Sequence, residues 1–302
     1  MTNAAEGLAV EQYPDLNREF YSSDPVTYFR NRYYLLLLAA SKADQLDQLL
    51  ANGVSYEGIT AQSELTEPTD EDERLHQAFL ITEAEVLLHH ASEALLRLYF
   101  AHEDLPECPW LEIARLTKFS EFKRRVAQLR DHSIPREHIG RIFLGSVPDQ
   151  HDDERQLLIG AIERLLRIVA RRTLEDAHLY NSSKHGLAVV SGPASLTITS
   201  DQTGASFDSS GPSISFLELS GDRTKWCRTT RWLPAQQSLW LTNLVITEMR
   251  ALWEIARARY TEVEISGVDA IRPEALNELQ ASAAPVRRVS MPLKYYQQSE
   301  QG

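Results

Sequence analysis

The residues best suited to chemistry lie in one short run, from Tyr180 to Gly186. On a helix, Asn181 and His185 are four residues apart and share a face. The Asn181 amide can therefore orient an imidazole whose proton exchanges near neutral pH. Lys184 stands beside them as a charge that attracts phosphate. The run thus predicts acid-base chemistry or phosphate binding.

The same helical face continues toward the N-terminus. Arg167, Arg171 and His178 precede Asn181 and His185, and the steps along the five are four, seven, three and four residues. At 3.6 residues per turn, these steps keep the five side chains within about a quarter turn. A polar face of this kind on an otherwise core-forming helix is unusual, and it makes these residues candidates for a site.

The Asn-x-x-x-His spacing of Asn181 and His185, near the end of a long helix, resembles the motif of the HEPN superfamily. In that superfamily an Arg, a following polar residue and a His four residues later lie in the last long helix of a bundle. A second likeness is to the first bundle helix of such proteins, and it rests on His89, His90, Glu93 and Arg97. The resemblance covers residues 76–186.

The resemblance implies a metal-independent ribonuclease that cleaves single-stranded RNA between two protomers, as in toxin-antitoxin and antiviral defence systems, or an inactive RNA-binding module. It implies a homodimer, with His185 as general acid or base and Asn181 as its orienting partner. Tyr180 occupies the catalytic position where active members carry Arg, and Tyr supplies no fixed positive charge there. The residues expected to contact RNA are Lys184, Arg171, His178 and Arg167.

The same run also fits a purely structural role. Asn181 and Ser182 can end the helix, and Lys184 and His185 suit its negative C-terminus. Gly186 then supplies a left-handed stop. The alternative function is a non-catalytic interaction or regulatory protein whose helices bind a protein partner.

A metal site is not predicted. Glu85, His89 and Glu93 recur at every fourth residue, which suits a metal in a helical bundle. The paired Glu-x-x-His motifs of di-iron bundles are absent, however, and Glu93 with Arg97 has the spacing of an ordinary helical ion pair. The sequence also holds no phosphate loop, dinucleotide fingerprint, nucleophile elbow or zinc spacing, so we expect no cofactor.

Apolar periodicity and capping signals predict the elements that position these residues. The expected helices occupy most of 24–53, 70–102, 111–129, 135–145, 153–186 and 234–266. Short β-branched runs between Gly-Pro and Gly-Asp turn signals predict an antiparallel meander. Its strands are expected at 187–190, 196–199, 214–219 and 225–232.

Helices of this length predict a mainly α fold, because a long amphipathic helix must lay its apolar stripe against others. We expect a helical bundle with a small antiparallel β-meander inserted before the last long helix. The predicted divisions are an N-terminal helical extension (1–69), an HEPN-like bundle (70–266) that contains the β insertion (187–232), and a C-terminal tail (267–302), loosely ordered after residue 281.

Charge and cysteine content narrow the class of protein. The net charge of −12 argues against a nucleic-acid partner, but the acidic excess lies mostly in residues 41–104. Residues 111–141 and 222–259 are net basic, which leaves room for a basic surface. Two cysteines, Cys108 and Cys227, are too few for a disulfide framework and are expected to be ordinary thiols.

No apolar run approaches the roughly 18 to 20 residues that a membrane span requires. The start of the chain also lacks a basic-then-apolar signal pattern. We therefore expect a cytoplasmic location without membrane contact.

Overall fold

The computed structural model describes residues 8–63, 69–145, 152–199, 206–265, 267–282 and 288–293. In this part the chain is mainly α-helical, with two small antiparallel sheets. It divides into two compact units, of which the first comprises 1–33, 87–177 and 240–282, and the second 34–86, 178–239 and 283–302. Helices α2, α4 and α10 each contribute residues to both units.

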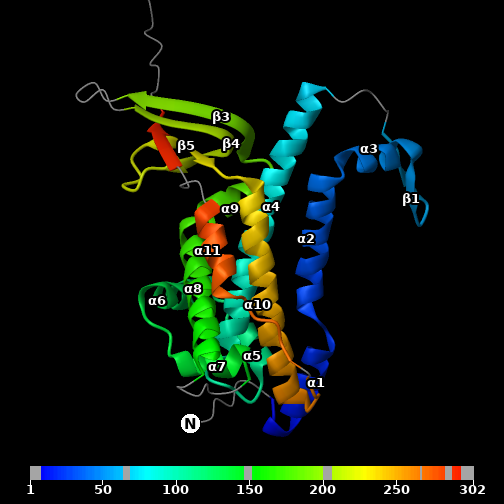
Figure 1. Ribbon diagram of the computed structural model, residues 1–302, viewed down its shortest axis with the longest axis vertical. Coiled ribbons are helices and arrows are strands. Elements are labelled where there is room, and N and C mark those ends of the chain that lie inside the picture. Colours follow the sequence, from blue (N-terminus) through cyan, green and yellow to red (C-terminus); the bar gives the residue numbers. More distant parts are fainter. Residues whose placement is uncertain are drawn as a thin grey trace, which may run out of the picture. The chain divides into compact units, whose positions relative to one another are not determined.

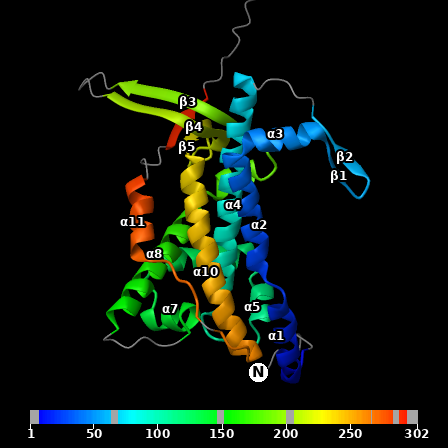
Figure 2. The same cartoon turned by 45° about the vertical axis from the view of Figure 1, so that its right-hand side comes forward.

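The first unit is a helical bundle (Figure 1). Its elements are η1 (Val10–Gln12), α1 (Tyr13–Ser22), the first half of α2 (Pro25–Ser41), the second half of α4 (Asp70–His102), α5 (Pro109–Arg115), α6 (Phe119–Asp131), α7 (Arg136–Phe143), α8 (Asp153–Glu175), most of α10 (Ala235–Thr261) and α11 (Pro273–Ser282). α4 and α10 run side by side in both ribbon views (Figures 1 and 2).

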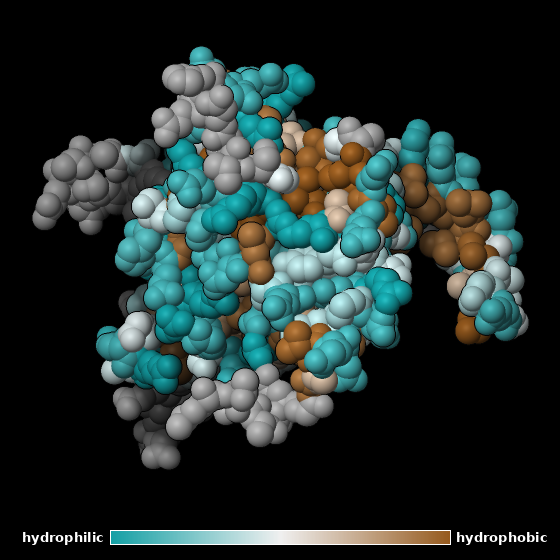
Figure 3. Space-filling model, turned by 90° about the horizontal axis from the view of Figure 1, so that it is seen from below, coloured by the Kyte–Doolittle hydropathy of each residue, from teal (hydrophilic) through white to brown (hydrophobic). Residues whose placement is uncertain are grey.

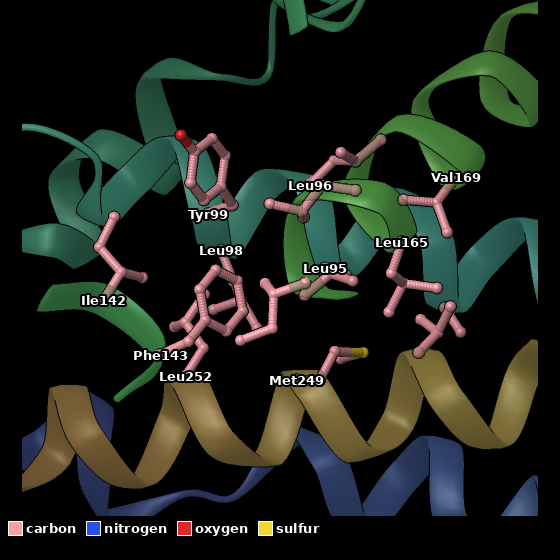
Figure 4. Packing of buried hydrophobic residues seen from close by; sticks show 14 of the residues in the cluster. Leu95, Leu96, Leu98, Tyr99, Ile142, Phe143, Leu165, Val169, Met249 and Leu252 are labelled. Carbon is pink, nitrogen blue, oxygen red and sulfur yellow. The ribbon is translucent and has the colours of Figure 1, made fainter. Parts of the chain in front are cut away.

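One apolar core joins the long helices of the first unit. Leu95 of α4, Leu165 of α8 and Met249 of α10 point into the same cluster (Figure 4), and all three are fully buried. α8 buries one stripe at three- and four-residue spacing, as the sequence predicts, whereas α4 and α10 are buried or half-buried on most sides in this unit. This packing confirms the mainly α fold.

α4 begins where the sequence predicts, because its first turn is capped from both sides. The backbone N–H of Asp72 donates to the Thr69 hydroxyl (3.2 Å), and the N–H of Thr69 donates to the Asp72 carboxylate (2.9 Å). Reciprocal bonds of this kind satisfy donors that a helix N-terminus leaves open. α4 then continues to His102, the predicted end.

The second unit contains a four-stranded antiparallel sheet in the order β3-β4-β5-β6. Its elements are the second half of α2, α3 (Ala43–Asn52), β1 (Val54–Tyr56), β2 (Ile59–Ala61), the first half of α4, α9 (Ala177–Ser183), β3 (Val189–Thr199), β4 (Ser206–Leu219), β5 (Trp226–Trp232) and β6 (Arg288–Pro292). β3, β4 and β5 form the predicted meander before α10. A small core of Ile81, Leu179, Ile214, Phe216 and Leu233 lies in this unit.

The strands differ from the predicted pattern at the Gly-Pro pairs. Gly192-Pro193 and Gly211-Pro212 are not turns but lie inside β3 and β4, where Pro193 faces Pro212. The carbonyl oxygen of Pro212 accepts from Leu233 on the β5 side (3.0 Å), so the backbone groups of Pro212 point away from β3. Neither missing N–H therefore interrupts the β3–β4 ladder.

Other boundaries also differ from the sequence prediction. The helix expected over most of 24–53 is divided at Lys42, whose backbone is not helical (φ −139°, ψ 34°). α1 and the β1–β2 hairpin have no counterpart in the prediction. The segment expected to be a tail contains α11, and after residue 281 it contributes β6, which pairs with β5 (Thr229 opposite Ser290).

Candidate functional site

The helix expected to run from residue 153 to 186 is interrupted at Asp176, which corrects the prediction of one polar face. The last helical hydrogen bond of α8 runs from the Asp176 N–H to the Arg172 carbonyl (2.8 Å). The Asp176 carboxylate is buried and lies 3.4 Å from the Arg172 guanidinium. α9 starts at the next residue as a separate helix, so the five residues do not lie on one continuous helix.

Arg167 and Arg171 therefore belong to α8 and to the first unit. The guanidinium of Arg167 donates to the His132 carbonyl (3.0 Å) and lies 3.3 Å from the Glu163 carboxylate. Arg171 is exposed and, within the described residues, has no hydrogen bond or ion pair. Of the two, Arg171 has the cation that is open to a ligand.

α9 is fixed to the sheet of the second unit by two neighbouring residues. Leu179 is buried in the small core against β4. The Nε2 of His178 donates to the carbonyl oxygen of Leu217 (3.0 Å), and its ring lies 5.5 Å from that of Phe216. This contact makes His178 an anchor of the helix on β4.

The motif segment, which we define as residues 180–186, ends α9 and exposes Asn181, Lys184 and His185 to solvent, whereas Ser183 is buried. The Nζ of Lys184 donates to the amide oxygen of Asn181 (3.2 Å) and lies 5.8 Å from the centre of the Tyr180 ring. Gly186 closes the segment in the left-handed region (φ +66°). Asn181 thus holds the lysine rather than the imidazole in this structure.

His185 is exposed in the turn after α9. Within the described residues it has no hydrogen bond or ion pair. Its imidazole is open to a ligand, beside the Lys184 ammonium along the chain. The sequence from residue 177 to 199 contains no Asp or Glu, although the whole chain has 43. The motif segment therefore lies in an acid-free stretch of an acidic chain.

His89 and Glu93, the candidate residues of α4 in the first unit, are buried or half-buried there. His89 is buried, and this burial lowers its pKa to about 4 against the opposing effect of the nearby Glu93 and Asp176 carboxylates. Glu93 forms an ion pair with Arg97 (2.6 Å), whose guanidinium lies 4.4 Å from the Phe122 ring centre. His89 is therefore neutral at pH 7.

Glu85, which the sequence groups with His89 and Glu93, accepts a hydrogen bond from the Ser238 hydroxyl. Across the described ranges, no three His, Cys, Asp or Glu side chains are placed to hold a metal ion.

The second unit also has a cavity of about 640 Å³ between α3, the start of α4 and the β3–β4 hairpin. Acidic side chains of α3 and α4 line it, among them Asp44, Asp47, Asp70 and Glu73. A surface of this charge repels phosphate, so the cavity is not part of a nucleic-acid site.

Two buried carboxyl groups in the described ranges, those of Glu248 and Asp176, were not singled out from the sequence. Glu248 on α10 is fully buried and accepts from the Ile271 N–H (2.6 Å), and burial raises its pKa to about 8. Asp176 ends α8. In the sequence, both look like ordinary charged residues of a helix. Only their burial in the structure distinguishes them from exposed carboxylates.

No family model, curated protein or solved structure matches the chain. The likeness to the HEPN superfamily therefore stays a prediction from the motif. No helix in the described ranges is long and apolar enough to cross a membrane.

Proposed function

We propose that the protein is an HEPN-like module that acts on single-stranded RNA through the motif segment. The observation that carries this proposal is the exposed, acid-free end of α9, where Lys184 and His185 are presented together. Lysine attracts phosphate, and imidazole and amide groups donate hydrogen bonds to phosphate oxygens. Tyr180, half-buried beside Lys184, offers an aromatic ring on which a base can stack.

Of the two activities within this proposal, RNA binding is better supported than cleavage. Asn181 is bonded to Lys184 and so does not orient His185, and Tyr180 supplies no guanidinium. Cleavage would require His185 as general acid or base and a second charge, which the neighbouring exposed Lys184 would supply.

The test is binding of labelled single-stranded RNA by fluorescence anisotropy at several salt concentrations. We expect Lys184→Ala to weaken binding several-fold and to reduce the slope of log K against log salt by about one. Lys123→Ala on α6 removes the same charge elsewhere and should change neither quantity. Equal affinity in wild type and Lys184→Ala would contradict the proposal.

A second candidate, a non-catalytic protein that works through its helices, is favoured by a different observation. Large apolar side chains of α2, α3 and α4 are exposed in the second unit. Absence of RNA binding together with self-association would favour this candidate.

A further inference from the structure

The first uncovered surface is the arm, which we define as residues 43–61, comprising α3 and the β1–β2 hairpin. No residue in this described stretch is buried. Leu46, Leu49 and Leu50 follow three- and four-residue spacing and form one apolar face of α3. Asp44 lies on the opposite face and lines the cavity, so the leucine face points away from it.

The hairpin continues the same apolar surface. Glu57 and Gly58 both have positive φ (46° and 85°), which makes the tight two-residue turn that joins β1 to β2. Tyr56 and Ile59 face each other across this turn and are 71% and 73% exposed. Hydrophobic side chains gather over α3 and the hairpin at the right of Figure 3.

The arm is too small to be stable while uncovered. An isolated helix of 10 residues is marginal in water, and so is a two-stranded hairpin. Both are well formed here although neither buries a side chain within the described chain. A surface that covers their apolar side chains would supply the missing stabilisation.

The second uncovered surface lies on α2 and α4. The Nε2 of His76 in α4 donates to the carbonyl oxygen of Ala39 in α2 (3.1 Å), so the two antiparallel helices are in contact at this level. Leu36 is buried, whereas Leu35 and Leu38 are 66% and 49% exposed. α2 is therefore apolar on its outer side as well as on its buried side.

α4 continues this surface with Leu75 and Phe79, which are four residues apart and about half exposed. Ala40 of α2 and Ile81 of α4 line the cavity, so the side of the helix pair that carries these two residues faces the cavity. The helical phase puts Leu75, Phe79 and Leu35 on the other side. We call Leu35, Leu38, Leu75 and Phe79 the strip.

We propose that a second copy of this chain covers both surfaces, with the arm of each copy packed on the strip of the other. At about 150 to 200 Å² for a large side chain, the exposed parts of the strip and of the arm each amount to roughly 400 Å². Together they give about 800 Å² per copy, which is what a standard stable interface buries on each partner. The inference is independent of the RNA proposal.

A two-fold axis explains why both surfaces occur on one unit. In a closed symmetric dimer each patch meets its complement on the partner, so a chain that carries the arm must also carry the strip. Acidic residues flank both surfaces, among them Glu57 in the hairpin turn and Glu71, one helical turn before Leu75. Association through apolar side chains should therefore persist or tighten as salt screens these charges.

The first experiment measures oligomeric state by sedimentation velocity from about 1 to 100 μM. We expect wild type to be a dimer. The strip variant (Leu75→Asp with Phe79→Asp) and the arm variant (Tyr56→Asp with Ile59→Asp) should each dissociate roughly 100-fold more readily. The control, Leu157→Asp with Leu187→Asp, adds the same charge at exposed leucines outside both surfaces.

The second experiment mixes the strip variant with the arm variant. In the proposed dimer the mixed pair has one intact arm-on-strip contact, whereas each variant alone has none, so the mixed dimer should be the tightest of the three. Packing of arm on arm and strip on strip predicts the reverse order.

Three results would overturn the inference: a monomeric wild type at 100 μM, loss of the dimer in only one of the two variants, or a mixed pair weaker than its parents. A monomeric wild type would indicate that the arm packs on its own chain or on a different protein. Circular dichroism of each variant shows that it is folded.

Discussion

The hydroxyl oxygen of Tyr21 in α1 lies 2.6 Å from the Nε2 of His102, the last residue of α4. The other ring nitrogen, Nδ1, lies 2.6 Å from the carbonyl oxygen of Leu98. A carbonyl can only accept, so Nδ1 carries the proton and Nε2 accepts from the tyrosine hydroxyl. Burial lowers the pKa of His102 to about 4 and raises the pKa of Tyr21, so both groups are neutral at pH 7.

This contact predicts that Tyr21→Phe destabilises the first unit. The substitution leaves the Nε2 of His102 buried without its donor, which costs about 1 to 3 kcal/mol. We expect that loss in the free energy of unfolding by urea at pH 7. Tyr13→Phe on the same helix removes a half-buried hydroxyl and should cost less than about 0.5 kcal/mol; equal losses in the two variants would show that the hydrogen bond is unimportant.

Acid should destabilise the protein through His89 and His102, the buried histidines of the described ranges. Burial lowers the pKa values of His89 and His102 to about 4, from 6.5. The stability is present above pH 6.5 and is lost as the pH falls toward 4, because the unfolded chain binds protons that the native chain does not. Each histidine should account for about 2 kcal/mol between pH 7 and pH 5. His89→Gln should lose less than wild type over that range, and parallel pH profiles would refute the assignment.

Base should destabilise the protein through Glu248. Its pKa is raised from 4.5 to about 8 by burial, so its contribution to stability is complete below pH 4.5 and is lost as the pH rises through 8. The loss should be on the order of 3 to 4 kcal/mol between pH 4.5 and pH 8.

The variant that tests this is Glu248→Gln, which keeps an oxygen to accept from Ile271 and cannot ionise. We expect it to gain stability relative to wild type as the pH rises from 5 to 8, measured by urea unfolding. Glu254→Gln, on the same helix and ion-paired with Arg257, is the control and should follow the wild-type profile. A constant difference between Glu248→Gln and wild type would exclude a buried neutral carboxyl.

RNA cleavage, if it occurs, should depend on His185 and increase when Tyr180 becomes Arg. A guanidinium at that position offers planar donors to the scissile phosphate. A tenfold gain requires only about 1.4 kcal/mol of transition-state stabilisation. The measurement compares cleavage of labelled RNA by wild type, Tyr180→Arg, His185→Ala and the double variant. If none of the four folded proteins cleaves the RNA, the ribonuclease activity is excluded and RNA binding is the only activity left in the proposal.

The long helices were predictable because their signals are local. Thr69 and Asp72 cap α4, and its apolar stripe recurs at regular spacing, so both ends follow from the sequence. The interruption at Asp176 was not predictable, because it accompanies burial of a carboxylate against Arg172. The predicted polar face was therefore wrong where it assumed an unbroken helix, and the role of its residues stays a prediction.

The β-meander was predicted at the right place in the chain, but the Gly-Pro pairs were wrongly predicted to be turns. The reason is again that the deciding contacts are not local. Gly192-Pro193 and Gly211-Pro212 are turn signals when each is considered alone. In the sheet the two prolines face each other, and their backbone groups point away from the shared ladder. Pairing between strands, which no local signal encodes, decides the outcome.

The fourth strand has a consequence for biosynthesis. β3, β4 and β5 leave the ribosome in succession, but β6 follows only after α10 and α11 have been synthesised. Until then β5 is an edge strand with open N–H and C=O groups that can pair with another chain. A growing polypeptide thus passes through a stage in which β5 is an exposed edge, and pairing with β6 is the event that covers it.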